Sequence, residues 1–188
     1  MSFPKKEISL LIAGIGGQGV RFLARMFSVL LHSEGYYVSS FSSYGAEVRN
    51  TPITASITIS KSPILSPYRL VHDLIIIMDK RVVNQVTKYS NKNTTIISVF
   101  NTESKEMRLP CKRILTIPLL SILSKNNLEK YLNTAILGLL ASLFTLPLDK
   151  CIRTTMESVR DKEANIRALE IGYKIGSKIK LSLKDIIL

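Results

Sequence analysis

The first hydrophobic segment of the chain, ISLLIAG at residues 8–14, has almost no polar alternation. A strand without polar alternation is covered on both faces, so this segment predicts a buried central strand. From Val20 to Glu34 the apolar positions recur every three or four residues, and Gly35 ends the pattern. This spacing predicts an amphipathic helix over residues 20–34.

Further segments alternate in the same way along the chain. Strand-like patterns occupy residues 36–42, 53–60, 73–78, 94–100 and 113–117, and helical patterns occupy 128–144, 148–159 and 163–179. In 53–60, Ile and Ala alternate with Thr and Ser, as in a strand with one drier face. The sequence therefore predicts an α/β fold over residues 1–188: a single three-layer domain with a mostly parallel or mixed sheet, a Rossmann-like first βα unit and a helical C-terminal third.

The most hydrophobic segment, AILGLLASLFTLPL at residues 135–148, contains only 14 residues and includes Pro147. It is too short to span a bilayer and is typical of a buried core helix. The start of the chain places two lysines before an apolar run, but that run breaks into glycines and is followed by Arg21 and Arg25, unlike a secretory signal. We expect a cytoplasmic protein without membrane contact.

The net charge of +12 is unevenly placed, since residues 80–130 hold ten Lys/Arg and three acidic residues. Such an excess attracts nucleic acid, a phosphorylated cofactor or an acidic partner, although a generally basic composition would give the same numbers. The chain has no Trp and no interleaving of basic and aromatic residues, which disfavours nucleic-acid binding.

Two cysteines and two histidines, none at metal-ligand spacing, favour neither a zinc site nor an iron–sulfur cluster on this chain.

The stretch LIAGIGGQGV at residues 11–20 is the first candidate site. Gly14, Gly16 and Gly19 satisfy G-x-G-x-x-G between a strand and a helix, where a tight turn and the helix N-terminus favour an anion. The candidate ligand-binding residues are Gly14, Gly16, Gly17, Gln18 and Gly19. A nicotinamide dinucleotide also needs a carboxylate roughly 20 residues on, and SSFSSYG offers none. Anion binding and simple strand–helix packing both remain open.

The second candidate stretch is SSYGAEVRNTP at residues 42–52, where Tyr44, Glu47 and Arg49 are clustered between two strands. Loops of this kind lie at the surface and often carry function. The alternative is a solvated turn with an ion pair between Glu47 and Arg49 that contributes little to stability.

Taken in order, GIGGQGV, SYGAEVR and ASITIS resemble the γ subunit of the 2-oxoacid:ferredoxin oxidoreductases, the enzymes for pyruvate, 2-oxoisovalerate (ketoisovalerate) and 2-oxoglutarate. The similarity continues through SPYRLVHDLIIIMDK, NTAILGLLASL and EANIRALEIGYKIG, so that it covers Ile8 to Gly176. One departure is that Asn50 and Thr51, followed by Pro52, stand where the family usually has a pair of glycines. This difference affects the backbone path expected after Arg49.

The resemblance implies a multi-subunit enzyme that decarboxylates a 2-oxoacid on thiamine diphosphate with Mg, passes electrons through [4Fe–4S] clusters to ferredoxin and forms acyl-coenzyme A. The cofactor ligands belong to the α, β and δ subunits, and this chain, which alone binds no cofactor and has no catalytic residue, frames the active site. Because Tyr44, Glu47 and Arg49 are too polar for a core and too clustered for an idle loop, we expect them at a subunit boundary near that active site. If the glycine loop binds a phosphate, we expect one from coenzyme A; a role of the glycines in packing alone is the alternative. The alternatives are a β-type subunit of an indolepyruvate oxidoreductase, against which SYGAEVR argues, and a free-standing nucleotide- or nucleic-acid-binding module.

Overall fold

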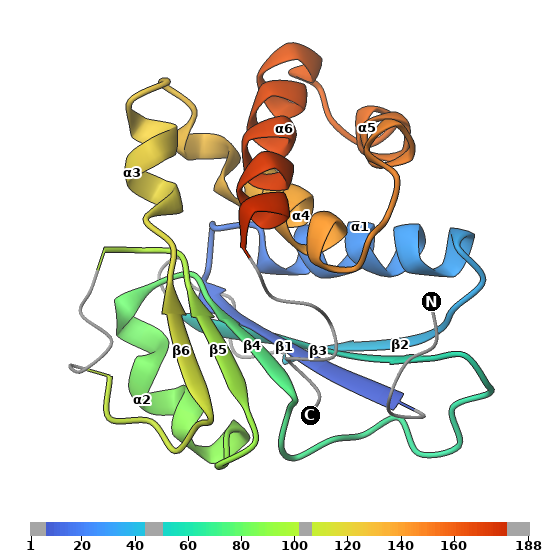
Figure 1. Ribbon diagram of the computed structural model, residues 1–188, viewed down its shortest axis with the longest axis vertical. Coiled ribbons are helices and arrows are strands. Elements are labelled where there is room, and N and C mark those ends of the chain that lie inside the picture. Colours follow the sequence, from blue (N-terminus) through green and yellow to red (C-terminus); the bar gives the residue numbers. More distant parts are fainter. Residues whose placement is uncertain (1–6, 44–50, 102–106, 180–188) are drawn as a thin grey trace.

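Six strands form one mixed sheet in the computed structural model, which describes residues 7–43, 51–101 and 107–179 (Figure 1). The sheet has the order β2-β3-β1-β4-β5-β6. Neighbouring strands are parallel in the series β1, β4, β5 and β6. Strand β3 is antiparallel to both of its neighbours, β1 and β2. The bounds are Glu7–Ile15 (β1), Tyr37–Ser42 (β2), Pro52–Ser60 (β3), Leu74–Ile77 (β4), Thr95–Ser98 (β5) and Arg113–Thr116 (β6). All six predicted strands are confirmed.

Helices cover one face of this sheet (Figure 1). They are α1 (Val20–Ser33), α4 (Leu132–Leu143), α5 (Leu148–Met156) and α6 (Lys162–Lys178). The opposite face carries the short α2 (Val83–Val86) between the 3-10 turns Lys80–Val82 and Thr87–Tyr89. Helix α3 (Leu119–Ser124) follows β6, and its buried residues belong to the same hydrophobic cluster as those of α1 and α4. The predicted α/β three-layer arrangement is therefore confirmed, with a third layer that is thinner than the first. The pattern missed α2 and α3, because four and six residues are too few to display a helical period.

Strand β1 separates two hydrophobic clusters. Leu10 and Ile12 point into the cluster under α1 and α4, whereas Leu11 and Ala13 point into the one around α2. All four are at most 2% exposed, which confirms the predicted central strand buried on both faces. The carboxyl end of β1 is thereby held from two sides, and this end leads into the glycine loop.

Helix α4 is the predicted core helix, and ten of its twelve residues are buried. It ends at Leu143, so the prediction of a helix to residue 148 is wrong at its end. Thr145 adopts a positive φ of 56°, which a continuing helix excludes, and the Leu146 amide turns back to the carbonyl oxygen of Ala141 at 2.8 Å. Within the described ranges, no helix is long and apolar enough to cross a membrane.

Candidate functional site

The glycine loop joins β1 to α1 at the carboxyl edge of β1, and Gly14 at its start is tightly enclosed. A Cβ atom at Gly14 would stand 2.8 Å from both Gln18 Oε1 and Val20 Cγ2, and 3.2 Å from Met78 Cβ. No side chain fits there without displacing its neighbours. Gly14 therefore serves the close packing of strand, loop and helix, and its place among the candidate ligand-binding residues stays a prediction.

The side chain of Gln18 folds back onto the two central parallel strands. Its Oε1 accepts a hydrogen bond from the Ile15 amide at 3.0 Å, and its Nε2 donates to Asp79 Oδ2 at 3.1 Å. The sequence places Gln18 among the ligand-binding candidates. In the structure, however, both the oxygen and the nitrogen of its side-chain amide form hydrogen bonds with protein groups. Gln18 fixes the shape of the loop.

Asp79 follows β4, the parallel neighbour of β1, and it is the carboxylate nearest to the loop in the contacts described. It accepts hydrogen bonds from Arg81 Nε and a terminal Arg81 nitrogen, both at 2.9 Å, and from the Arg81 amide at 3.0 Å. The bond to the Arg81 side chain holds the pKa of the Asp79 carboxyl below its usual range. The carboxylate is ionised and already occupied by protein donors.

The sequence reasoning missed Asp79 because it searched for a carboxylate at the end of residues 36–42. That segment is β2, which lies at the sheet edge, beyond β3. The signal that could have found Asp79 is its position directly after the continuous apolar run LIIIM, since the carboxyl ends of parallel neighbours meet at one edge of the sheet.

The open part of the loop lies at Gly17. Gly17 has a φ of 99°, and a Cβ there would meet nothing within 4 Å. The Gly16 and Gln18 amides donate to the carbonyl oxygens of Thr51 and Ile15, at 2.8 and 3.1 Å. The amides of Gly17 and Gly19 have no hydrogen-bond partner among the residues that the structure describes. An anion approaching the loop would therefore meet the Gly17 side of it first.

Helix α1 begins beside this open part, with Gly19 as its N-cap at a φ of 74°. Its first turn contains no acidic residue and no side chain caps it, so the positive end of the helix dipole faces the loop. Asn133 of α4 covers the other side of Gly19, where a Cβ would stand 2.3 Å from Asn133 Nδ2. Sequence reasoning did not include Asn133, because the two positions come together only through the packing of α4 on α1.

Tyr44, Glu47, Arg49 and Asn50 lie outside the described residues, so their predicted role stays a prediction. The flanks of this stretch are described. The Ser43 amide donates to the carbonyl oxygen of Thr54 at 2.8 Å, and Pro52 is the first residue of β3, opposite Ile15 of β1. The connection from β2 to β3 therefore leaves and re-enters the sheet at the edge that carries the glycine loop.

The donor set of the chain does not fit an iron–sulfur cluster, which needs four cysteine ligands where the sequence has two cysteines. Cys151 is buried in α5, and burial raises the pKa of its thiol to about 11. Cys111 is half-buried, and burial raises its pKa as well. Across 7–43, 51–101 and 107–179 no three His, Cys, Asp or Glu side chains are grouped to hold a metal ion.

Fold and loop together define an α/β protein with a Rossmann-like βα unit whose glycine loop opens at the sheet edge. Residues 9–175 match the family described as pyruvate ferredoxin/flavodoxin oxidoreductase, and the chain belongs to this family. It is 32% identical over 140 residues to the pyruvate synthase subunit PorC of Methanosarcina barkeri, covering 72% of this chain and 76% of that protein.

A longer relative is the ketoisovalerate oxidoreductase subunit VorA of Methanothermobacter marburgensis, 27% identical over 176 residues. The match covers 89% of this chain but only 36% of that relative's length. Among solved structures, the 2-oxoglutarate:ferredoxin oxidoreductase of Magnetococcus marinus, with 2-oxoglutarate, coenzyme A and succinyl-CoA bound, has the same fold, with a TM-score of 0.79 at 16% identity. That likeness covers 92% of this chain and 31% of the other.

Proposed function

We propose that this chain is the γ subunit of a multi-subunit 2-oxoacid:ferredoxin oxidoreductase that converts a 2-oxoacid to acyl-coenzyme A. The observation that carries the proposal is the hydrogen bond between the Gly16 amide and the Thr51 carbonyl oxygen, at 2.8 Å. It brings together the two stretches on which the family resemblance depends, the glycine loop and the end of the SYGAEVR connection. Family membership and the 32% identity to the pyruvate synthase subunit PorC support the same conclusion.

In this proposal the loop at Gly17 receives a phosphate of coenzyme A once the partner subunits complete the pocket. The amides of Gly17 and Gly19 and the positive end of α1 attract an anion. Asp79 does not oppose it with a free charge, because the Arg81 guanidinium is bonded to that carboxylate. The solved 2-oxoglutarate:ferredoxin oxidoreductase of Magnetococcus marinus, which has the same fold and holds coenzyme A, supports this choice of ligand.

The proposal assigns the remaining chemistry to other chains. Thiamine diphosphate, Mg and the [4Fe–4S] clusters belong to α, β and δ subunits, and ferredoxin takes the electrons from the complex. Tyr44, Glu47 and Arg49 border the active site across a subunit boundary. The proposal includes a cytoplasmic location for the complex.

The test is to purify the tagged chain from the cells that naturally make it and to identify the proteins that come with it. We expect partner chains that bring thiamine diphosphate and iron, and a preparation that reduces ferredoxin in the presence of a 2-oxoacid and coenzyme A. The chain produced alone serves as the control and should be colourless and inactive. Recovery of the chain alone, or with partners that carry neither thiamine nor iron, contradicts the proposal.

A further inference from the structure

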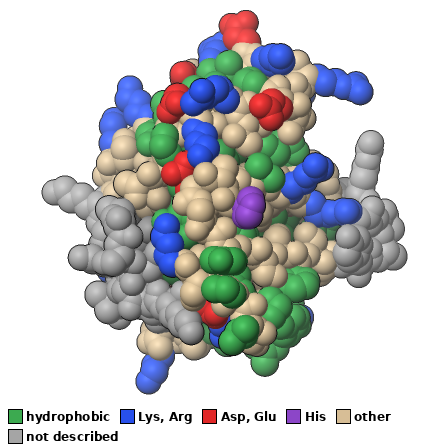
Figure 2. Space-filling model, turned by 90° about the vertical axis from the view of Figure 1, so that its right-hand side faces the viewer, with side chains coloured by type: hydrophobic (Ala, Val, Ile, Leu, Met, Phe, Trp, Pro, Cys, Tyr) green, Lys and Arg blue, Asp and Glu red, His purple; other side chains and the backbone are tan. Residues whose placement is uncertain are grey.

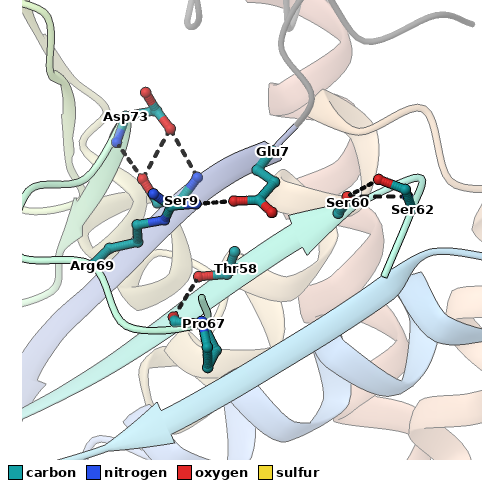
Figure 3. A network of polar contacts seen from close by, with 8 residues as sticks. All are labelled: Glu7, Ser9, Thr58, Ser60, Ser62, Pro67, Arg69 and Asp73. Atoms are coloured by element: carbon teal, nitrogen blue, oxygen red, sulfur yellow. Dashed lines mark hydrogen bonds and ion pairs between the residues drawn. The ribbon is translucent and has the colours of Figure 1, made fainter. Parts of the chain in front are cut away.

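The segment 61–73 between β3 and β4 crosses the sheet face opposite α1, and polar contacts fix its C-terminal end to β1 (Figure 3). Asp73 Oδ2 accepts hydrogen bonds from both the amide and the hydroxyl of Ser9, each at 2.9 Å. The Asp73 amide in turn donates to the Ser9 hydroxyl at 3.1 Å. Four residues earlier, Arg69 forms an ion pair with Glu7 of the same strand.

The rest of the segment is fixed to β3. Thr58 Oγ1 donates to the carbonyl oxygen of Pro67 at 3.0 Å, and the Ser62 amide donates to Ser60 Oγ at 3.1 Å (Figure 3). His72 Nε2 lies 2.8 Å from Ser56 Oγ. Pro67 also restricts its own φ. The backbone of the segment is thus held at its start, middle and end.

Between these anchors the segment presents large apolar side chains to solvent, because Leu65 is 90% exposed, Tyr68 71% and Leu70 69%. Two exposed aromatic residues of β2 lie on the same side of the sheet: Tyr37 is paired across the strands with Ser60, and Phe41 with Ser56. We define the apolar patch as these five residues together with Val71. Figure 2 views the end of the sheet that lies on the right in Figure 1, where the segment between β3 and β4 runs, and hydrophobic side chains gather in the lower part of that view.

A loop that keeps its backbone ordered while it exposes its apolar side chains bears the entropy cost of ordering without the gain from burial. Exposed apolar groups gathered on one face mark a surface that another molecule covers. The one cation of the segment between Ser62 and Asp73, Arg69, is paired with Glu7. The patch is therefore apolar rather than cationic, and suits an apolar protein surface better than nucleic acid or anionic lipid.

We infer that the apolar patch docks this chain onto a partner subunit of the oxidoreductase, the one that corresponds to the remainder of the longer relatives. This inference rests on the proposed function. The chain spans 36% of the ketoisovalerate oxidoreductase relative and 31% of the solved 2-oxoglutarate enzyme chain, but 76% of the pyruvate synthase subunit. In the long chains a covalent link holds this domain to the rest. Where that remainder is a different polypeptide, as in the proposed function, only a non-covalent surface can join it to this domain.

The experiment compares two double variants of the tagged chain in its native host. Leu65→Asp with Leu70→Asp places two charges in the patch, and Val29→Asp with Leu120→Asp places two charges on exposed apolar positions of α1 and α3. Because all four side chains are exposed, each purified variant should melt close to the wild type. Leu65→Ser with Leu70→Ser is a milder third variant that adds no charge.

We expect the patch variant to recover roughly tenfold less, or lower still, of the partner chains and of the thiamine and iron that they bring than the wild type does. The serine variant should lose less, and the α1/α3 variant should recover the partner chains fully. If the wild type recovers that partner and the patch variant recovers as much, the inference is wrong and the proposed function stands. If the wild type recovers no such partner, both fail. A purified wild type that is dimeric, with a monomeric patch variant, would show a second copy on the patch and overturn the inference.

Discussion

The Gly16 amide donates a 2.8 Å hydrogen bond to the carbonyl oxygen of Thr51, across the gap between the glycine loop and the start of β3. Thr51 and Pro52 belong to the stretch at which we expect the chain to depart from the family's usual sequence. Pro52 fits as the first residue of β3, a position that proline tolerates in a strand. The departure thus leaves the loop tied to the following strand through a backbone carbonyl, which any residue at position 51 supplies.

Replacing Gln18 with Ala should destabilise the fold. It removes both side-chain hydrogen bonds of Gln18 and leaves the Ile15 amide, on a residue only 5% exposed, without its acceptor. We expect the free energy of unfolding to fall by about 1–3 kcal/mol, measured by urea titration. The control is Gln85→Ala, since Gln85 is exposed on α2. Equal stability of the two variants would contradict the structural role assigned to Gln18.

Replacing Gly172 with Ala should separate α4 from α6. A Cβ at Gly172 would stand 1.7 Å from the carbonyl oxygen of Ala135, so the helices cannot keep their distance. Overpacking of this kind lowers the free energy of unfolding by roughly 1–3 kcal/mol or more. The higher helix propensity of Ala raises it by about 1 kcal/mol at most, so the variant should be less stable. Ser177→Ala, at an exposed position of the same helix, is the control. A variant with an unchanged or higher melting temperature would contradict the close approach of the two helices.

The stability of the protein should depend on His72 between pH 6.5 and 4. His72 is 2% exposed, and burial lowers its pKa from 6.5 to about 4 although the charge of Asp73 acts in the opposite direction. Below pH 6.5 the unfolded chain binds a proton that the folded chain excludes, so the His72 contribution is complete above pH 6.5 and is lost as the pH falls toward 4. We expect this loss to total about 3 kcal/mol.

The measurement is the free energy of unfolding at several pH values for the wild type and for His72→Gln. The difference between the two curves should change by about 1.4 kcal/mol per pH unit in this window. The same measurement on His32→Gln, at an exposed position of α1, is the control. Parallel curves for the wild type and His72→Gln would mean that His72 titrates normally in the folded protein.

The hydrophobic pattern predicted the sheet well because its strands are continuous apolar or alternating runs. The hydrophobic periodicity alone predicted both β1 and α1. The glycines between them are neighbours along the chain, so the sequence showed them directly. The contacts that shape the loop are not local. Asp79 reaches it from the turn after β4 and Asn133 from α4, and only the strand order and helix packing bring them there.

The sequence alone could not predict the apolar patch either. Residues such as Leu65, Tyr68 and Leu70 have the composition of core positions, and no period distinguishes an exposed apolar loop from a buried one. Their exposure follows from the polar anchors at Ser9 and Thr58, which hold the backbone on the sheet and direct these side chains outward.

The most direct test of the central claim is the Michaelis constant for coenzyme A of the assembled oxidoreductase carrying Gly17→Asp. The added carboxylate points into the open space beside the amides of Gly17 and Gly19 and should repel a phosphate. Gly35→Asp is the matched control, because Gly35 also has a positive φ, of 78°, and open space around a Cβ, but lies beyond the other end of α1. Gly17→Asn separates the charge from the backbone strain.

We predict that Gly17→Asp raises the Michaelis constant for coenzyme A by roughly tenfold, about 1.4 kcal/mol, with little change in that for the 2-oxoacid. Gly17→Asn should have a smaller effect and Gly35→Asp none. Equal changes for both substrates, or no change for coenzyme A in a folded and assembled Gly17→Asp enzyme, would contradict the claim that this loop meets coenzyme A.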